Sequence, residues 1–220
     1  MGPIKIIIIQ TILGEKMEFV ILILLSYLLG SVPGGYLIAK LNKVDITKVG
    51  SGNIGTTNVW RTLGPKWGIA TFLFDAGKGL LALILVNILF NQPMVGYYII
   101  AGALAILGHF KSIFLKFKGG KTVATSLGVI IGLIIVKLLP IWFAVIIIGV
   151  FLLTLWRKRE VSRASMYAAI TAVIIKLVFY GGFNQQSFEV TIFIIGILVL
   201  IIFTHRENIK RIQEGIERKI

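Results

Sequence analysis

The chain has 220 residues, of which 57% are hydrophobic and only 15% are charged. So little charge argues against a soluble domain, and apolar runs without alternation argue against a β-barrel, so the composition predicts a multi-pass α-helical membrane protein. The absence of cysteine excludes disulfide and thiolate chemistry, two histidines argue against a zinc site, and the formal net charge of +14 fits basic cytoplasmic loops better than nucleic-acid binding.

The first sixteen residues, MGPIKIIIIQTILGEK, form an apolar stretch that is too short to cross a bilayer. They lack a small-residue cleavage site, so we do not expect a cleavable signal peptide. We treat them as an N-terminal extension of unassigned role, with Met17 as an alternative start. The remainder needs no second domain, and we expect a single membrane domain over residues 1–220.

Seven apolar spans follow this extension. We predict them at residues 19–39, 67–90, 94–108, 122–137, 139–156, 164–181 and 188–204. The third and fourth are shorter than the about 20 residues that cross a bilayer. We therefore expect these two to be tilted, broken or shielded by neighbouring helices. The predicted fold is an all-α integral membrane protein, a bundle of seven transmembrane helices.

Lysine and arginine collect in alternate connections between these spans. Of the 23 basic residues, 18 fall in four segments, at 40–66, 111–121, 157–163 and 206–219, whereas the connections NQPMV and GFNQQS have none. Because cytoplasmic loops are enriched in Lys and Arg, this pattern predicts that the N-terminus lies outside and the C-terminus lies in the cytoplasm.

A glycine-rich loop, GSGNIGTTNVWR, follows the first span and the helix-breaking stretch SVPGG. Glycines expose backbone N–H groups to an anion, short polar side chains add donors, and arginine binds phosphate in a bidentate way. A flexible connector would not need this combination, so we predict an anion site, although the spacing is not that of a Walker A or dinucleotide motif. The candidate residues are Gly50, Ser51, Gly52, Asn53, Gly55, Asn58 and Arg61.

The second span contains DAGKG, with Asp75 and Lys78 inside the predicted membrane. An intramembrane lysine is costly and usually functional. Alternatively, the two side chains are three residues apart on a helix and neutralise each other. Both interpretations stay open at this stage.

The stretch GHFKSIFLKFKGGKT precedes the fourth span, and its Lys118, Gly119, Gly120 and Lys121 come at a predicted helix N-terminus. The helix dipole and free N–H groups favour a phosphate there, while the phenylalanines also suit a lipid interface. His109 in the same stretch is a candidate general base, although a lone histidine is more often structural.

The stretch HREN follows the last span. Its His205 and Asn208 either complete a site or form a polar belt where the helix leaves the membrane, and HREN taken alone favours the belt. Outside the tail, the only predicted cytoplasmic carboxylates are Asp45 and Glu160, and no Ser–His–Asp set or acid pair is apparent. Many anion donors with few carboxylates predict a site for phosphate groups at the membrane surface.

Four motifs together resemble the bacterial acyl-phosphate:glycerol-3-phosphate acyltransferase family of the PlsY type: GSGNIGTTNVWRTLG, DAGKG, GHFKSIFLKFKGGKTVAT and HRENIKRI. They span most of the chain in the expected order. Two residues depart from the family pattern, Ser112 where proline is expected and Thr122 where glycine is expected. These departures concern local loop geometry more than function.

The resemblance implies an enzyme of the bacterial cytoplasmic (inner) membrane, with its active site facing the cytoplasm, that starts phospholipid synthesis. It would transfer a fatty acyl group from acyl phosphate to the 1-hydroxyl of glycerol 3-phosphate, giving lysophosphatidic acid and orthophosphate. The implied partners are these substrates and membrane lipids, with no cofactor and no metal. Motif matching assigns catalysis to Ser51, Arg61, His109 and His205, and substrate binding to Gly50, Gly52, Asn53, Gly55, Asn58, Lys78, Lys118, Gly119, Gly120, Lys121, Ser162 and Asn208.

The sequence favours acyl phosphate over acyl-CoA as the donor. CoA-dependent glycerol-phosphate acyltransferases have an aspartate after His and four intervening residues, whereas this chain has Phe114 after His109 and Lys210 after His205. The cytoplasmic connections are also too short to enclose CoA. The alternative function is a membrane transporter of a phosphorylated small solute, which broken helices and basic residues also suit. A transporter predicts polar residues on both membrane sides and an internal repeat, and neither is evident.

Overall fold

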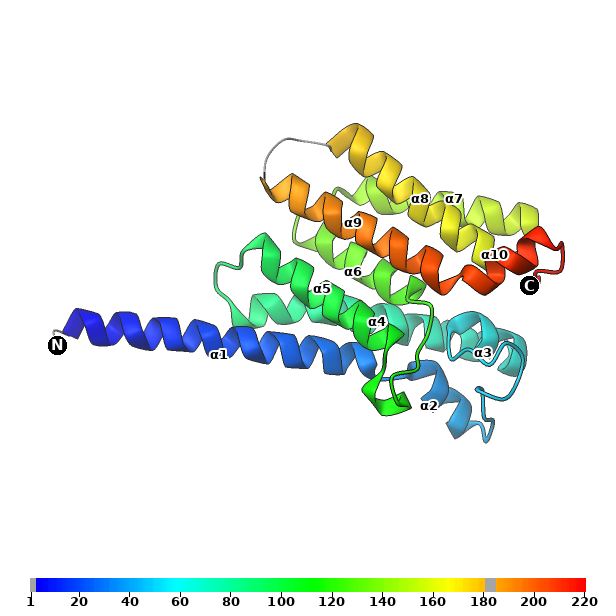
Figure 1. Ribbon diagram of the computed structural model, residues 1–220, viewed down its shortest axis with the longest axis horizontal. Helices are drawn as coiled ribbons and strands as arrows, with labels where there is room; N and C mark the ends of the chain where they lie inside the picture. The colour runs from blue at the N-terminus through cyan, green and yellow to red at the C-terminus, as the bar shows by residue number, and fades with distance from the viewer. Residues whose placement is uncertain (1–2, 181–184) are drawn as a thin grey trace.

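The computed structural model describes residues 3–180 and 185–220, with side chains for 14–179 and 185–220, and its regular elements are helices (Figure 1). The predicted all-α fold class is confirmed for this part of the chain. In chain order the elements are α1 (Pro3–Ser31), α2 (Gly34–Leu41), α3 (Thr56–Leu63), α4 (Pro65–Leu89), α5 (Val95–Phe110), the short 3-10 helix η1 (Ile113–Leu115), α6 (Val123–Ile135), α7 (Ile141–Lys158), α8 (Val161–Tyr180), α9 (Gln185–Thr204) and α10 (Arg206–Gln213).

Four of these helices, α4, α7, α8 and α9, are long and apolar enough to cross a membrane. A fifth span results if α1, from Gly14, and α2 are counted as one helix with a bend of 41°. Helices α5 and α6 are apolar but have only 16 and 13 residues. Apolar helices therefore occur at all seven predicted positions, and the number that cross the membrane stays a prediction.

The ends of the predicted spans differ from the helices at two places. The segment 1–16 was expected to be a separate extension, but α1 begins at Pro3 and continues without a break to Ser31. The prediction that SVPGG breaks the first span is confirmed, since the chain leaves the helix before Pro33 and resumes at Gly34. The expected connection GFNQQS falls partly on residues 181–184, which lie outside the described residues, and its last three residues begin α9.

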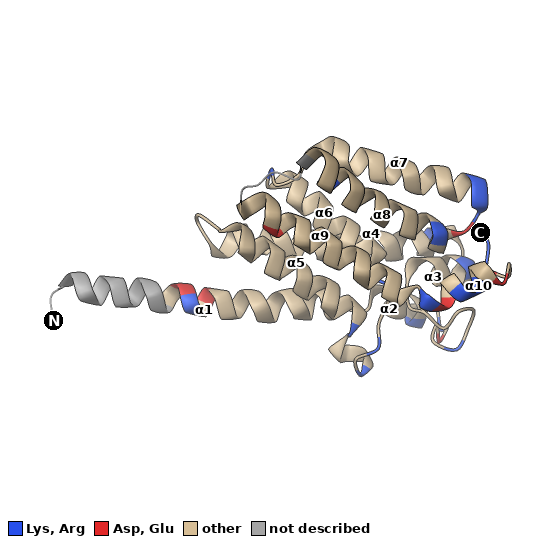
Figure 2. Ribbon diagram, turned by 45° about the horizontal axis from the view of Figure 1, so that its top comes forward, with Lys and Arg blue, Asp and Glu red and all other residues tan. Residues whose placement is uncertain are grey.

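Two short polar helices, α3 and α10, were not predicted from the sequence. They lie at one end of the bundle, together with α2, and Figure 2 shows most Lys and Arg residues gathered at this end. In Figure 1, α1 extends beyond the other helices at the opposite end. The basic loops that the sequence predicted to be on one side thus share one end of the molecule.

Helices α4 and α6 pack closely through small residues. A side chain at Gly79 would collide with the carbonyl of Thr125, and one at Gly128 would collide with the carbonyl of Ala76. Helices in a bilayer associate through such close backbone contacts, because apolar burial gives little drive there. This contact fixes the first turn of α6 against α4 and so positions the polar loop that precedes α6.

Candidate functional site

A cavity of about 490 Å³ lies at the basic end of the bundle and extends between the apolar helices. Its polar end is lined by residues of the loop after α2, of α3, of the two positions before α6, of α10 and of the tail that follows it, with polar side chains from α4, α5 and α8. Its apolar part is lined by side chains of α6, α7, α8 and α9, among them Leu127, Ile130, Phe151, Ala172 and Ile197. The cavity therefore suits a molecule with a charged head and a hydrocarbon chain.

The glycine-rich loop is organised by one buried amide. Asn58, on α3, is 2% exposed, and its Nδ2 donates to the carbonyls of Ile46, Val49 and Asn53, at 3.3, 3.0 and 2.9 Å. Its Oδ1 accepts a hydrogen bond of 2.9 Å from the N–H of Ser51. Because these bonds occupy the amide, Asn58 holds the loop in shape, even though it also lines the cavity.

The glycines of this loop serve its shape. Gly50 has a φ of +61°, and a side chain on it would collide with Oδ1 of Asn58. Gly52 also has a positive φ, of +68°. Neither residue lines the cavity, whereas Ser51, Asn53 and Gly55 do. The loop thus presents one serine and one asparagine to the cavity, and glycines make the turns between them.

The second glycine loop, residues 118–121, lies against the end of α5. The N–H of Gly120 donates to the carbonyl of His109 at 3.0 Å, and a side chain at Gly120 would collide with the imidazole of His109. The double glycine thus permits the loop to lie over this ring. Only Lys121 of the predicted set lines the cavity, while Lys118 is exposed.

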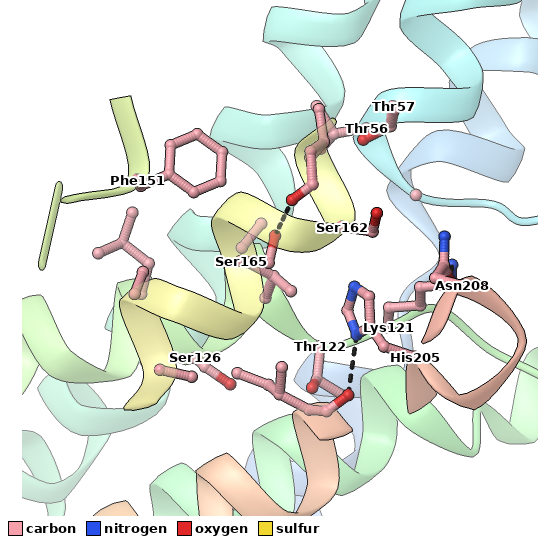
Figure 3. Close-up of a pocket in the computed structure, with 18 of the residues that line it drawn as sticks. Thr56, Thr57, Lys121, Thr122, Ser126, Phe151, Ser162, Ser165, His205 and Asn208 are labelled. Carbon is pink, nitrogen blue, oxygen red and sulfur yellow. Dashed lines mark hydrogen bonds between the residues drawn. The ribbon is translucent and has the colours of Figure 1, made fainter. Parts of the chain in front are cut away.

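Lys121 is one of the cations that line the polar end. Its Nζ hydrogen-bonds Oδ1 of Asn208 on α10, and Figure 3 shows it between Asn208 and the ring of His205. Burial, together with the nearby charge of Arg211, lowers the pKa of Lys121 to about 8. The ammonium is therefore protonated at neutral pH but close to its titration range.

His205 is the N-cap residue of α10 and is 3% exposed. Its Nδ1 lies 2.8 Å from the carbonyl oxygen of Ile201, which fixes Nδ1 as the protonated nitrogen and leaves the Nε2 lone pair as an acceptor (Figure 3). Burial first, and then the charge of Lys121, lowers the pKa of His205 to about 4. The ring is neutral at physiological pH, so it is a hydrogen-bonding group and a weak base.

The C-terminal tail closes the polar end with a carboxylate that the sequence analysis missed. Glu217 accepts hydrogen bonds from Ser162 at 3.0 Å, from Asn208 at 2.7 Å and from Arg211 at 2.9 Å. Burial alone would raise the pKa of Glu217, but these hydrogen bonds outweigh burial and lower it. Arg61 donates to the carbonyl of Arg218 at 2.8 Å. The ionised Glu217 thus connects α8 and α10 across the site.

Two features of the tail could have drawn attention to it. Gly215, with a φ of +72°, turns the chain back after α10, and Glu217 stands directly before Arg218 and Lys219. Arg211 also faces the cavity from α10. The cavity is lined by four cationic residues, Arg61, Lys121, Arg211 and Arg218, and by two carboxylates, Asp75 and Glu217, so it carries an excess of positive charge that suits an anion.

A second charged cluster lies between α4, α5 and the break after α1. Lys78 Nζ lies 2.9 Å from Oδ1 of Asp75 and donates to the carbonyl of Val32 at 2.9 Å. Nδ1 of His109 lies 3.5 Å from the same Asp75 oxygen. Lys78 and Asp75 are both 2% exposed, and Asp75 lines the cavity whereas Lys78 does not. The geometry favours the interpretation that the pair neutralises itself, and it adds an Asp–His contact that the sequence did not suggest.

The structure brings most of the predicted site residues together. The cavity is lined by Ser51, Asn53, Gly55, Asn58, Arg61, His109, Lys121, Ser162, His205 and Asn208. The predicted residues that do not line it are Gly50, Gly52, Lys78, Lys118, Gly119 and Gly120. Within the described residues, no group of three or more His, Cys, Asp or Glu side chains is arranged to hold a metal ion.

Comparison with known proteins gives one consistent family. The sequence profile described as glycerol-3-phosphate acyltransferase matches residues 20–215. The chain is 42% identical over 198 residues to a protein of Carboxydothermus hydrogenoformans named glycerol-3-phosphate acyltransferase, covering 90% of this chain and 94% of the relative. It is 43% identical over 202 residues to a protein of the same name from Thermus thermophilus, covering 90% and 93%.

Two solved structures are similar over most of their length. Both are crystal structures of PlsY (YgiH), an integral membrane glycerol 3-phosphate acyltransferase. The glycerol 3-phosphate form gives a TM-score of 0.80 with 38% identity, and the lysophosphatidic acid form gives 0.78 with 37%. Each comparison covers 92% of this chain and 95% of the other.

Proposed function

Because the chain belongs to the glycerol-3-phosphate acyltransferase family, we propose that it transfers a fatty acyl group from acyl phosphate to the 1-hydroxyl of glycerol 3-phosphate. The products would be lysophosphatidic acid and orthophosphate. The observation that carries this proposal is the cavity itself, in which a cationic end continues into an apolar groove. One end fits phosphate groups, and the other fits the acyl chain.

The reaction depends mainly on how the two substrates are positioned. The acceptor hydroxyl attacks the carbonyl carbon of acyl phosphate, a new C–O ester bond forms, and the bond from the carbonyl carbon to the phosphate oxygen breaks. Phosphate leaves with the electron pair of that bond. Arg61, Lys121 and Arg211 would hold the phosphate groups at the polar end, and such placement of reactants with charge stabilisation supplies much of the acceleration in acyl transfer.

The acceptor hydroxyl loses its proton during the reaction, so a base must accept that proton. The low pKa of His205, about 4, makes its Nε2 a poor general base. The ring of His109 lies between Asp75 and Gly120, which suits a role in positioning the glycine loop. We assign the proton to the departing phosphate, which takes it up as it becomes orthophosphate, while His205 stays a neutral hydrogen-bonding group at the polar end.

The structure also supports acyl phosphate as the donor. The polar end is built from short loops, the eight-residue helices α3 and α10 and the seven residues after α10, and little protein surrounds it that could enclose the nucleotide of CoA. Two compact phosphate groups need only the cations and glycine loops present here. The rest of the lining consists mainly of apolar side chains of α6 to α9, which suits a hydrocarbon chain better than the path of a transported phosphorylated solute.

We further propose that seven spans cross the bacterial cytoplasmic membrane, with the N-terminus outside and the site facing the cytoplasm. The gathering of basic residues at the cavity end supports this orientation (Figure 2). The chain has no cysteine, so Lys118→Cys and Asn91→Cys, both at exposed positions, give clean labelling sites. A membrane-impermeant thiol reagent should label position 91 and not position 118 in intact cells, and the reverse result would contradict the orientation.

The activity is tested with the purified chain, palmitoyl phosphate and glycerol 3-phosphate. We expect lysophosphatidic acid and orthophosphate in equal amounts, and much slower transfer from palmitoyl-CoA. Comparable turnover from the CoA ester, or product without stoichiometric orthophosphate, would contradict the proposed donor. Uptake of glycerol 3-phosphate into sealed proteoliposomes without acyl transfer would favour the transporter instead.

A further inference from the structure

Two hydroxyl groups lie where the polar end of the cavity meets its apolar part, those of Thr122 and Ser126. Both residues line the cavity, and they are 1% and 2% exposed. Neither hydroxyl has a hydrogen-bond partner among the described residues. Buried polar groups almost always have partners in folded proteins, so an exception at a cavity wall needs a specific explanation.

The order of groups along the start of α6 matches the order of groups in an acyl phosphate. The N–H of Ser126 donates to the carbonyl of Thr122 at 2.8 Å, so the two side chains lie one turn apart on one face of the helix. Lys121 precedes them at the polar end, and the next lining residues, Leu127 and Ile130, are apolar. Figure 3 shows Thr122 beside His205 and Ser126 farther from Asn208. From the polar end inward, the cavity wall thus presents first the ammonium of Lys121, then two hydroxyls and then alkyl side chains.

Thr122 also has an unusual backbone conformation. Its φ is +65° and its ψ is −10°, in the left-handed region that a β-branched residue rarely adopts. The family motif predicts glycine at this position, which would adopt the same conformation without strain. Threonine here accepts strain and adds a buried hydroxyl facing the cavity. Residues held in such conformations cluster at ligand and active sites.

We propose that the hydroxyls of Thr122 and Ser126 donate hydrogen bonds to the carbonyl oxygen of the acyl donor. This inference rests on the proposed function and specifies how the donor is held. The carbonyl of an acyl phosphate lies between its phosphate and its alkyl chain, as the hydroxyls lie between Lys121 and Ile130. When the acceptor hydroxyl attacks, the carbonyl oxygen gains negative charge, and donors fixed in a buried wall stabilise it.

Kinetics of four variants test the assignment. Ser126→Ala and Thr122→Gly each remove one hydroxyl, and the glycine suits the positive φ. Since loss of one oxyanion donor typically costs 100-fold or more, we expect kcat/KM for palmitoyl phosphate to fall at least about tenfold in each variant and on the order of 100-fold in the double variant. KM for glycerol 3-phosphate should stay unchanged, and Thr122→Ser, which keeps the hydroxyl, should retain activity.

Thr125 provides the matched control. It is 0% exposed on the same helix, and its hydroxyl also has no partner among the described residues, but it does not line the cavity. Thr125→Val should therefore leave the kinetics unchanged. An equal loss in Thr125→Val, or a rise in KM for glycerol 3-phosphate in Ser126→Ala, would overturn the assignment to the donor carbonyl.

A spectroscopic measurement separates this inference from the proposed function. The probe is a long-chain β-ketophosphonate with a carbon-13 carbonyl, in which a methylene replaces the bridging oxygen and prevents cleavage. Its carbonyl stretch should move to lower wavenumber on binding to the wild-type protein and to Thr125→Val, and this shift should be lost in the Ser126→Ala/Thr122→Gly double variant.

The two measurements together distinguish a failure of the proposed reaction from a failure of the hydroxyl site. A shifted stretch without acyl transfer from acyl phosphate would overturn the proposed reaction and support the hydroxyl site. Acyl transfer by the wild-type protein with an unshifted stretch of the bound probe, or with a shift that the double variant keeps, would overturn the hydroxyl site and leave the proposed reaction standing.

Discussion

The protein buries charged side chains in two places, and the partners that neutralise these charges differ between the two. In α4, the ammonium of Lys78 has the carboxylate of Asp75 and the carbonyl of Val32 as partners, and it does not face the cavity. At the polar end of the cavity, Arg61, Lys121 and Arg211 lie around the carboxylate of Glu217. In the first cluster, which we call the closed cluster, one lysine is matched by one carboxylate, although Asp75 and His109 also line the cavity. The second cluster has more cations than carboxylates.

This difference separates structural charge from functional charge. An intramembrane lysine usually marks a function, and sequence alone left Lys78 open to that interpretation. In the structure Lys78 has protein partners for its charge, from which we infer a structural role. A buried cation whose partners all come from the protein stabilises the fold, and a group of cations with one partner between them attracts an anion from outside. The predictions below test whether the two clusters really differ in this way.

The largest effect should come from breaking the closed cluster. Lys78→Met leaves Asp75 as a buried and largely uncompensated carboxylate, and removing one partner of such a pair typically costs about 3–5 kcal/mol. We expect a corresponding loss in the free energy of unfolding, measured by denaturant titration in detergent. In protein that remains folded, KM for glycerol 3-phosphate should stay close to that of the wild type.

The double variant Asp75→Asn/Lys78→Met is the control for this result. It removes both charges, so it should be less destabilised than Lys78→Met alone. If Lys78→Met is as stable as the wild type but loses affinity for glycerol 3-phosphate, the closed cluster belongs to the binding site and the comparison fails.

Arg61→Ala and Ser51→Ala should have the next largest effect, and on activity rather than folding. Both residues line the polar end, and loss of one donor to a developing charge costs about 100- to 1000-fold in turnover. Acyl transfer and circular dichroism on the same preparations measure the two quantities separately.

Lys210→Ala is the matched control, because Lys210 is a basic residue of α10 with a side chain 77% exposed. Its activity should match that of the wild type. Near-normal turnover in both Arg61→Ala and Ser51→Ala would show that the glycine-rich loop is only a connector and that the surplus charge has no catalytic use.

Asn58→Ala should have a smaller effect that reaches activity through structure. The substitution removes the amide that holds the loop carrying Ser51 and leaves several buried backbone groups without partners, at a cost of about 1–3 kcal/mol. We expect a lower melting temperature and reduced turnover together. Asn42→Ala, which removes one hydrogen bond to the carbonyl of Ile38, should change both much less. Reduced turnover at unchanged stability would mean that Asn58 contacts substrate directly.

The sequence predicted most of the fold because the relevant signals are local. Apolar runs located the helices, Pro33 located the break between α1 and α2, and polar motifs located the loops that meet at the cavity. The short helices α3 and α10 escaped notice, since each has only eight residues and a polar sequence. Each is amphipathic, but eight residues are fewer than the window of about 11 to 18 residues in which a helical period is recognised.

The parts of the site that sequence reasoning missed depend on contacts between distant residues. Glu217 meets Ser162 across 55 residues, and His109 approaches Asp75 from another helix. No periodicity reports such pairings, because they follow from how helices pack. The motif FKGGKT also does not indicate that Lys121 lines the cavity and Lys118 does not, because the turn between them is set by the contact of Gly120 with His109.

The smallest predicted effect is a pH dependence that distinguishes the two clusters most directly. The pKa of Lys121, lowered to about 8 by burial and by Arg211, means that its positive charge is present below that pH and is lost as the pH rises through it. Phosphate monoesters, with a second pKa of about 6, are already dianionic there. His205, with a pKa of about 4, stays neutral throughout this range. The affinity for phosphate should therefore fall above about pH 8 because Lys121 loses its proton.

Measured between pH 7 and pH 9, KM for glycerol 3-phosphate should rise up to about tenfold, because one unit above its pKa only about a tenth of a group is protonated. A bound anion stabilises the ammonium, which shifts the titration upward in the complex and makes tenfold the upper limit. Lys121→Arg keeps its charge over the whole range, since the guanidinium titrates above about pH 12. That variant should show a flat profile. An equally steep rise of KM in Lys121→Arg would assign the titration to another group. Lys121 would then not belong to the surplus positive charge that distinguishes the cavity from the Asp75–Lys78 pair in α4.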